Sequence, residues 1–144
     1  MALQLVALAA VGAVGLWGPG WAGGVRVPAI GIALVLTGLG GALAVAGLRH
    51  LGGALSPFPA PVQGAPLRRR GAYGLVRHPI YGGLLLLCLA WTGFTSPLAA
   101  APTVALALVF EGKRRHEEAW LRRHHADYEA YAQAVPRRFV PFIW

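Results

Sequence analysis

"YGLVRHPIYGG" (residues 73–83) stands where a basic segment meets an uncharged apolar run. Three consecutive arginines shortly precede it, and no charged residue occurs from position 80 to position 110. Pro79 suits the first turn of a helix, because its missing N–H would have no intrahelical partner there. His78 precedes the proline and is therefore biased towards extended backbone. The stretch predicts a helix that begins at Pro79 and runs into an apolar environment.

The apolar run is too long for one straight membrane helix. A helix over residues 80–110 would reach roughly 46 Å, against a hydrocarbon core of about 30 Å. The sequence "TSP" (residues 95–97) interrupts the run near its middle. We therefore expect a helical hairpin, with a short first helix over residues 81–94 and a second helix that starts near Pro97. Apolar residues recur at helical spacing among the charges that follow, so the second helix should continue as an amphipathic helix.

Two more apolar segments precede the basic loop. Residues 2–17 are uncharged and end at "GPGWAGG" (residues 18–24), and residues 27–48 form the clearest membrane helix in the chain. The second segment contains "GLGGALAVAG" (residues 38–47), whose small side chains allow close contact between helices. The Gly- and Pro-rich stretch over residues 51–70 is expected to form a loop.

Composition indicates a membrane protein with one domain. The 144 residues are 56% hydrophobic and 12% charged, whereas soluble domains carry about 25% charged residues. The predicted fold is an all-α integral membrane protein with about four transmembrane helices. Its expected parts are two N-terminal spans (1–48), a cytoplasmic loop (49–79), an apolar helical hairpin (80–110), and a cytoplasmic helix and tail (111–144).

The formal charge of +8 has a membrane-protein distribution. No acidic residue precedes Glu111, and the basic residues flank apolar segments. This pattern favours cytoplasmic loops that face anionic lipid over a nucleic-acid groove. We expect a multi-pass protein of the prokaryotic inner membrane with both termini in the cytoplasm. Membrane lipids and a lipophilic small molecule are the expected partners, without nucleic acid or an obligate protein partner.

This topology brings two polar segments to the same membrane face. One covers residues 68–81 and the other covers residues 113–131, so His78 and Tyr81 should approach the Glu117–Glu118 pair. Consecutive helical residues point about 100° apart, so only one of the two carboxylates is expected to face a given target. The other carboxylate is expected to pair with a nearby arginine, namely Arg114, Arg115 or Arg122. A salt-bridged helix face and an interfacial histidine are the structural alternatives for these residues.

Metal and nucleotide motifs of the common soluble types do not occur in the sequence. There is no HExxH pattern, no cysteine pair, no P-loop and no GxGxxG loop that follows a strand. We therefore predict no metal site. Cys88 is interpreted as a small buried hydrophobic residue.

"GAYGLVRHPIYGG", followed downstream by "KRRHEEAWLRRHHADYEAYAQAVPRRFVPF", resembles the isoprenylcysteine carboxyl methyltransferase family. The resemblance covers roughly residues 66–141, and phospholipid N-methyltransferases are related in the same part. The short N-terminal part is similar to that of the small prokaryotic members. The resemblance implies a membrane enzyme that uses S-adenosyl-L-methionine and releases S-adenosyl-L-homocysteine. Its acceptor would be lipophilic, either the carboxylate of an isoprenylcysteine-like compound or a lipid amine.

The resemblance also implies site residues. Lys113 matches a position where an arginine contacts substrate in the family. The carboxylate of the cofactor suits the helix N-terminus at His78, and its ammonium group suits Glu117 or Glu118. No catalytic residue is expected, because methyl transfer depends mainly on alignment of the acceptor with the methyl carbon. The predicted cofactor-binding residues are Leu67, Arg68, Tyr73, His78, Pro79, Ile80, Tyr81, Glu117 and Glu118.

Two other functions fit parts of the sequence. A non-catalytic lipid-binding membrane protein would explain the basic face. An NADPH-dependent membrane reductase is the other alternative, since sterol reductases share a related C-terminal architecture. The reductase ranks lowest at this point because it requires a much longer chain with many spans.

Overall fold

The computed structural model describes residues 2–51 and 67–141. These residues contain helices and no strand, so the predicted all-α class is confirmed. Residues 52–66, which make up most of the predicted Gly- and Pro-rich loop, lie outside the described residues. The elements in chain order are α1 (Ala2–Trp17), η1 (Gly23–Val25), α2 (Arg26–Leu51), α3 (Ala72–Leu75), α4 (Pro79–Phe94), η3 (Pro97–Ala99), α5 (Ala100–His124) and α6 (Tyr128–Ala134).

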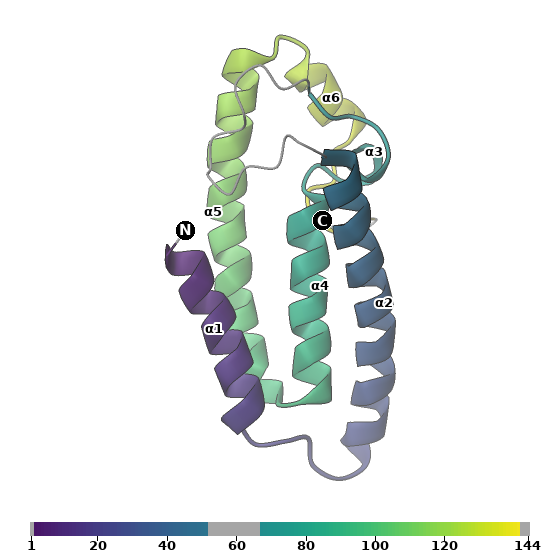
Figure 1. Ribbon diagram of the computed structural model, residues 1–144, viewed down its shortest axis with the longest axis vertical. Coiled ribbons are helices and arrows are strands. Elements are labelled where there is room, and N and C mark those ends of the chain that lie inside the picture. Colours follow the sequence, from purple (N-terminus) through teal and green to yellow (C-terminus); the bar gives the residue numbers. More distant parts are fainter. Residues whose placement is uncertain (1, 52–66, 142–144) are drawn as a thin grey trace.

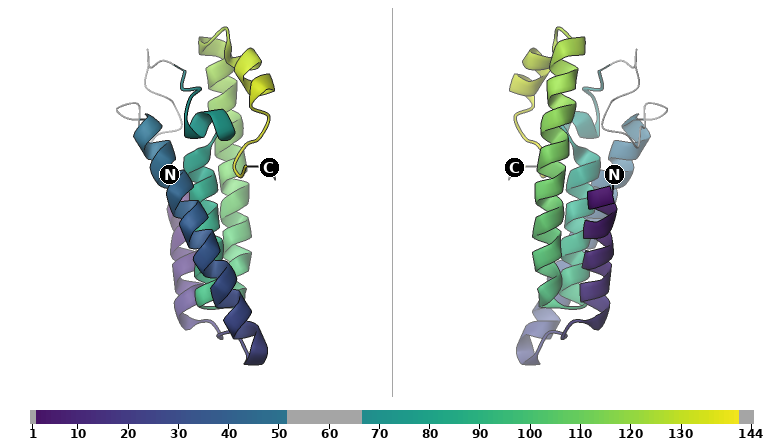
Figure 2. Two further views of the ribbon diagram at one scale, coloured as in Figure 1. Left: turned by 90° about the vertical axis from the view of Figure 1, so that its right-hand side faces the viewer. Right: turned by 90° about the vertical axis from the view of Figure 1, so that its left-hand side faces the viewer.

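Helix α4 is the centre of the bundle. It packs along α2 on one side, and α1 and α5 lie on its other side (Figure 1). The α1–α2 connection and the α4–α5 turn lie at one end of the molecule, while α3, α6 and the last turns of α5 lie at the other (Figure 2). We call the second end the polar end, and it comprises residues 67–79 and 111–141.

The predicted hairpin is confirmed. Helix α4 begins at Pro79 and ends at Phe94, and the interruption at residues 95–97 is a turn. The Ser96 hydroxyl accepts a hydrogen bond from the Leu98 N–H at 3.3 Å, which caps the start of η3. Helix α5 then continues for 25 residues to His124 without a break where the sequence changes from apolar to charged. The expected continuation of the helix into the charged segment is therefore confirmed as far as His124, where α5 ends before the separate helix α6.

The α2–α4 contact depends on small residues. A Cβ atom added at Gly40 would lie 2.8 Å from the Gly83 carbonyl oxygen, and one added at Gly83 would lie 2.6 Å from the Ala44 nitrogen. The two backbones can approach this closely because neither glycine has a side chain. The prediction of close helix contact from the small residues of this segment is confirmed.

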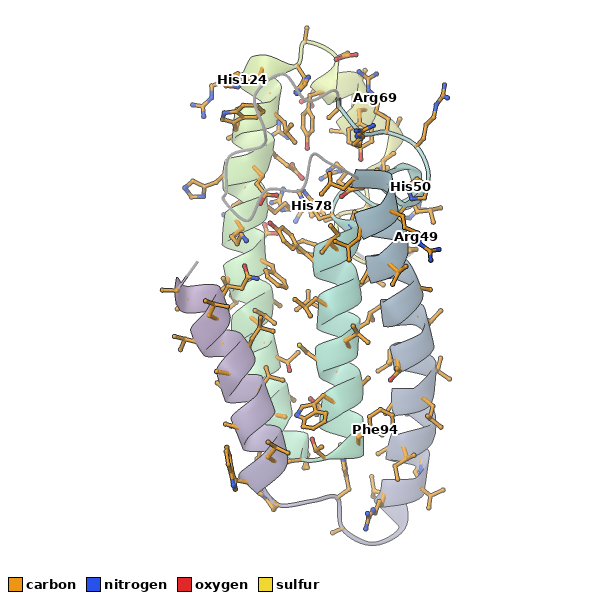
Figure 3. The ribbon with its side chains drawn as sticks, viewed as in Figure 1. Arg49, His50, Arg69, His78, Phe94 and His124 are labelled. Atoms are coloured by element: carbon orange, nitrogen blue, oxygen red, sulfur yellow. The ribbon has the colours of Figure 1, made fainter. Side chains whose placement is uncertain are left out.

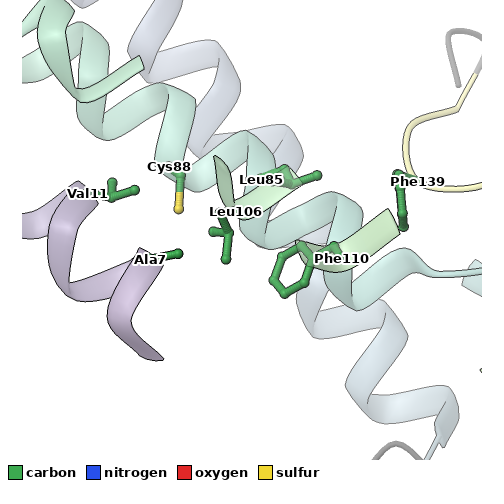
Figure 4. Packing of buried hydrophobic residues seen from close by; sticks show 7 residues of the cluster. All are labelled: Ala7, Val11, Leu85, Cys88, Leu106, Phe110 and Phe139. Atoms are coloured by element: carbon green, nitrogen blue, oxygen red, sulfur yellow. The ribbon is translucent and has the colours of Figure 1, made fainter. Parts of the chain in front are cut away.

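The apolar core lies between α1, α4 and α5 (Figure 4). Cys88 is buried in it and packs as a small hydrophobic residue, as its position in an apolar run indicated. The core extends to the polar end through Phe110 and Phe139, which are fully buried. The members are Ala7, Val11, Leu85, Cys88, Leu106, Phe110 and Phe139.

One helical stretch among the described residues, Gly23–Leu51, is long and apolar enough to cross a membrane. Helices α1 and α4 are also apolar, but each has only 16 residues. The predicted count of four transmembrane helices is therefore not confirmed by helix length and composition. Large apolar side chains nevertheless point outward along the bundle, including Leu5, Val27, Ile32, Val104 and Leu108.

Candidate active site

The start of α4 is fixed by the tail of the chain. His78 is the N-cap residue, and Pro79 occupies the first helical turn as the sequence predicted. The His78 N–H donates to the Arg138 carbonyl at 2.8 Å. A Cβ atom added at Gly82 would lie 1.8 Å from the Phe139 carbonyl oxygen, so the tail lies directly on the first turn of α4. Figure 3 shows His78 at this end of α4.

Two predicted cofactor-binding residues face another helix. Pro79 is fully buried, and the side chains of Pro79 and Ile80 pack against Gly47 of α2. A Cβ atom added at Gly47 would lie 2.9 Å from Ile80 Cγ1 and 3.1 Å from Pro79 Cγ. These two residues therefore join α4 to α2, while Tyr81 faces α5.

Aromatic side chains hold the Tyr81 ring in place. Its ring lies parallel to the His78 ring, with centroids 5.6 Å apart, and stacks on Phe110 with centroids 4.6 Å apart. The Phe139 ring lies beside the His78 and Tyr81 rings and is tilted by 59° to each of them. Stacked and tilted rings at these separations attract one another, so the Tyr81 hydroxyl has a fixed direction.

That hydroxyl is directed at Glu117. Tyr81 donates a hydrogen bond to Glu117 Oε1, and His78 Nδ1 lies 3.6 Å from Glu117 Oε2. Burial raises the pKa of Glu117 above its ordinary value, although the Tyr81 hydrogen bond and the charges of His78 and Lys113 oppose this effect. The Glu117 side chain is still 18% exposed, so it can exchange a proton with water.

The neighbouring Glu118 has a different environment. Its side chain is 1% exposed, and Arg77 Nε, His78 Nε2 and Arg114 Nη1 lie within 3.0–3.1 Å of its oxygens. Burial raises the pKa of Glu118, but the hydrogen bonds from His78 and Arg77 outweigh burial and hold it at about 2. Glu118 is therefore ionised at neutral pH and balances buried cations, and the expected pairing of one glutamate with Arg114 is confirmed.

The expectation that only one of the two glutamates would face a given target is wrong for His78. Glu117 approaches Nδ1 of the imidazole, and Glu118 approaches Nε2. Adjacent helical positions do point in different directions. A ring with a nitrogen on each side can nevertheless bridge them, because it lies between the two carboxylates.

The sequence analysis did not select Arg77, which proves to be central. Arg77 Nε donates to Glu118 at 3.0 Å, and Nη1 donates to the carbonyls of Val135 at 2.7 Å and Pro136 at 2.9 Å. One guanidinium thus ties α5 to the tail. Its position beside His78 and its five N–H donors were the available signal, because arginine satisfies several acceptors at once.

The remaining predicted residues lie at the edge of this cluster. Tyr73 is half-buried, and burial together with the charge of Glu117 raises its pKa to about 12, while Arg68 opposes the rise. Leu67 packs against an apolar cluster that contains Tyr128 and Tyr131, and Arg68 is exposed. The structure therefore brings Tyr73, rather than Leu67, towards Glu117.

Lys113 connects the site to α1. Its Nζ atom lies 5.1 Å from the centroid of the Tyr81 ring and donates to Gln4 Oε1 at 2.8 Å. A cation over an aromatic face is attracted by the ring quadrupole. The predicted contact of Lys113 with substrate stays a prediction.

In chemical terms, the cluster combines an oriented hydroxyl, a carboxyl group that can exchange protons with water, and nearby cations. The described residues contain no group of three or more His, Cys, Asp or Glu side chains that could hold a metal ion. The site is suited to holding and moving a proton beside an apolar bundle.

Comparison with known proteins gives independent information on the candidate site. No protein-family model matches the chain. The chain is similar to sterol reductases. It is 31% identical over 85 residues to the Delta(14)-sterol reductase TM7SF2 of Mus musculus, a match that covers 56% of this chain and 20% of that protein. It is 30% identical over 86 residues to the Delta(14)-sterol reductase of Methylotuvimicrobium alcaliphilum, covering 57% of this chain and 20% of that protein. The chain thus spans about a fifth of the length of these relatives.

These similarities correct the functional prediction. The relatives are named as reductases, so the predicted isoprenylcysteine carboxyl methyltransferase membership is wrong. The methyltransferase activity and the S-adenosyl-L-methionine cofactor are wrong with it. The physical reason is that a histidine at a helix N-terminus and a facing carboxylate suit several polar cofactors. Those residues alone do not distinguish a methyl donor from a hydride donor.

Proposed function

We propose that this chain is a membrane-embedded reductase module that adds hydrogen across a carbon–carbon double bond of a lipophilic, sterol-like substrate. The similarity to two Delta(14)-sterol reductases supports this reaction class. The observation that carries the proposal is the Tyr81–Glu117 hydrogen bond at the boundary of the apolar bundle. A reductase of this kind must deliver a proton at such a boundary, because its substrate is apolar and its proton comes from water.

The proposal includes a membrane position. Helices α1 and α4 and the apolar part of α5 would accompany α2 in the bilayer, which gives four membrane helices. The outward-facing apolar side chains of α1, α2 and α5 support this placement. The polar end carries most of the basic residues and would lie in the cytoplasm of a prokaryotic cell, with both ends of the chain on that side.

A nicotinamide cofactor would, when bound, supply a hydride and with it both electrons of the reduction. The residues present fit such a group. Glu117 can accept a hydrogen bond from a carboxamide N–H, and Tyr73 offers an aromatic surface next to it. Arg68 is exposed close to Tyr73 and can bind phosphate oxygens.

The chain's own residues would supply the proton. As the π bond breaks, the Tyr81–Glu117 pair would give a proton to one alkene carbon, and the other carbon would receive the hydride that the bound cofactor would supply. The raised pKa of Glu117 keeps its acid form available at higher pH than for an exposed glutamate. Because Glu117 is partly exposed, water restores the proton after each turnover. The stacked rings of His78 and Phe110 keep the Tyr81 hydroxyl aligned during the transfer.

Isotope labelling tests this function directly. The full chain in nanodiscs would be given NADPH and a sterol with a 14(15) double bond, in deuterated water. We expect a saturated product that carries one solvent-derived deuterium. The same experiment is repeated with Tyr81→Phe, which removes the hydroxyl of the pair. Tyr128→Phe is the matched control, because the buried Tyr128 hydroxyl has no hydrogen-bond partner among the described residues. Absence of any reduced product would overturn the proposed function, and a product without solvent deuterium would overturn the role of the pair.

A further inference from the structure

A groove lies on the surface between α1 and α5, beside the candidate active site. Its volume is about 530 Å³. Lys113 belongs both to the groove and to the site, because the same ammonium group lies over the Tyr81 ring. The other principal lining residues are Leu3, Gln4, Leu108, Val109 and His116.

The groove is amphipathic along its length. Leu3 and Leu108 are large apolar residues that are 66% and 70% exposed, so their side chains have no cover in the described part of the chain. Lys113 and His116 lie about one and two turns further along α5, beyond the point where the helix becomes charged. No acidic residue lines the groove in the described part of the chain, and its polar part therefore attracts anions.

We infer that this groove binds one anionic phospholipid of the surrounding membrane. An acyl chain would lie along Leu3, Leu108 and Val109, and the phosphate would accept hydrogen bonds from Lys113. The ammonium group has three donors, and the hydrogen bond to Gln4 occupies one of them. Basic residues at the depth of the headgroups attract anionic lipid, which is the charge complementarity that this occupant needs.

Lipid at this position would act on the neighbouring site. Lys113 is one of the charges that lower the pKa of Glu117 against the effect of burial. A phosphate on Lys113 would offset that positive charge and so favour the acid form of Glu117. The inference does not depend on the reductase reaction, because lipid binding can be measured without substrate.

The groove can be filled without disturbing the fold. Gly112 lines it, and a Cβ atom added at Gly112 has nothing within 4 Å. Gly112→Leu therefore places a side chain in the space of the acyl chain, and leucine also favours a helix more than glycine does. Gly38→Leu is the matched control, since Gly38 is an exposed glycine of α2 that also has nothing within 4 Å of an added Cβ.

The full chain is placed in nanodiscs that contain equal amounts of phosphatidylglycerol and phosphatidylcholine and is then purified from them. Native mass spectrometry identifies the lipid that the protein retains. We expect about fivefold enrichment of phosphatidylglycerol in the wild type and in Gly38→Leu. Gly112→Leu and Lys113→Gln should lose this enrichment of phosphatidylglycerol. Their helical circular dichroism should stay equal to that of the wild type. Equal retention of both lipids by the wild type, or undiminished enrichment in folded Lys113→Gln, would overturn the inference. If Gly112→Leu does not fold, the phosphatidylglycerol enrichment of Lys113→Gln alone tests the inference.

Discussion

The hydroxyl of Tyr81 donates a hydrogen bond to the carboxylate of Glu117 and joins the first turn of α4 to the charged half of α5. The contact closes the open end of the helical hairpin. It also places a carboxyl group that water can reach at the edge of an apolar bundle. The proposed proton delivery depends on this relationship.

Removal of either partner should slow the reduction. Tyr81→Phe keeps the stacked ring but removes the hydroxyl, and Glu117→Gln removes the exchangeable carboxyl proton. We expect each variant to lower kcat by about 10²–10⁴-fold, the usual contribution of general acid catalysis. The double variant should lose little more than either single one, because the two groups act as a unit. Steady-state rates with NADPH check this, and rates that stay within twofold of wild type would contradict it.

Loss of Glu118 should affect folding more than chemistry. Glu118→Ala leaves the buried guanidinium group of Arg77 without its carboxylate, whereas Arg114 keeps its ion pair with Glu111. We expect a loss of about 3–5 kcal/mol in the free energy of unfolding, because an uncompensated buried charge is costly. Denaturant titration in detergent measures this quantity, with Tyr128→Phe as a control that should change it little. A stability equal to wild type would show that Glu118 does not hold the polar end together.

Stability should also fall in acid. The pKa of Glu118 is about 2 in the folded chain, against 4.5 for an ordinary glutamate. A carboxyl group whose pKa is lowered by folding stabilises the folded state at every pH above its pKa in the unfolded chain. This contribution disappears as the pH falls from 4.5 towards 2. The loss for Glu118 is roughly 3 kcal/mol, at about 1.4 kcal/mol for each pH unit. Denaturant titrations at pH 6 and pH 3 should show the decrease, and Glu118→Gln should show a smaller one. An unchanged decrease in that variant would contradict the assignment.

Gly82 should tolerate no side chain. A Cβ atom there would lie 1.8 Å from the Phe139 carbonyl oxygen, so Gly82→Ala must displace the tail from α4. We expect a destabilisation of about 1–3 kcal/mol, as for other overpacked sites. Limited trypsin digestion should then cut faster after Arg137 and Arg138. Gly112→Ala has open space around the added atom and should be neutral or stabilising. Equal digestion rates of the two variants would contradict the contact.

The sequence was sufficient to predict the helices, because local chemistry determines where they begin and end. Pro79 has no N–H to satisfy and starts α4, and the interruption at residues 95–97 separates α4 from α5. The charged and apolar spacing after Phe110 indicated that the helix continues, which holds as far as His124, but it did not indicate the break before α6. The close approach of α2 and α4 followed from their glycines.

Side-chain directions at the site were harder to predict. Helix α4 is apolar around most of its circumference, so its sequence pattern does not show which face meets α5. The family resemblance assigned Pro79 and Ile80 to the site, and no helical pattern contradicted it, although they pack on α2. The role of Arg77 depends on backbone carbonyls of the tail, at Val135 and Pro136, which carry no sequence signal.

The cofactor prediction failed for a chemical reason. A carboxylate such as Glu117 accepts hydrogen bonds from an ammonium group and from a carboxamide alike. The same residues therefore fitted a methyl donor as well as a hydride donor. Only the similarity to the two sterol reductases separated the alternatives.

Cofactor binding by the full chain tests the central claim most directly. Isothermal titration of the protein in nanodiscs, with NADPH and separately with S-adenosyl-L-homocysteine, compares the two cofactor classes at one site. The reductase account predicts saturable NADPH binding that Glu117→Gln weakens and Tyr128→Phe leaves unchanged. Binding of S-adenosyl-L-homocysteine without binding of NADPH would contradict it.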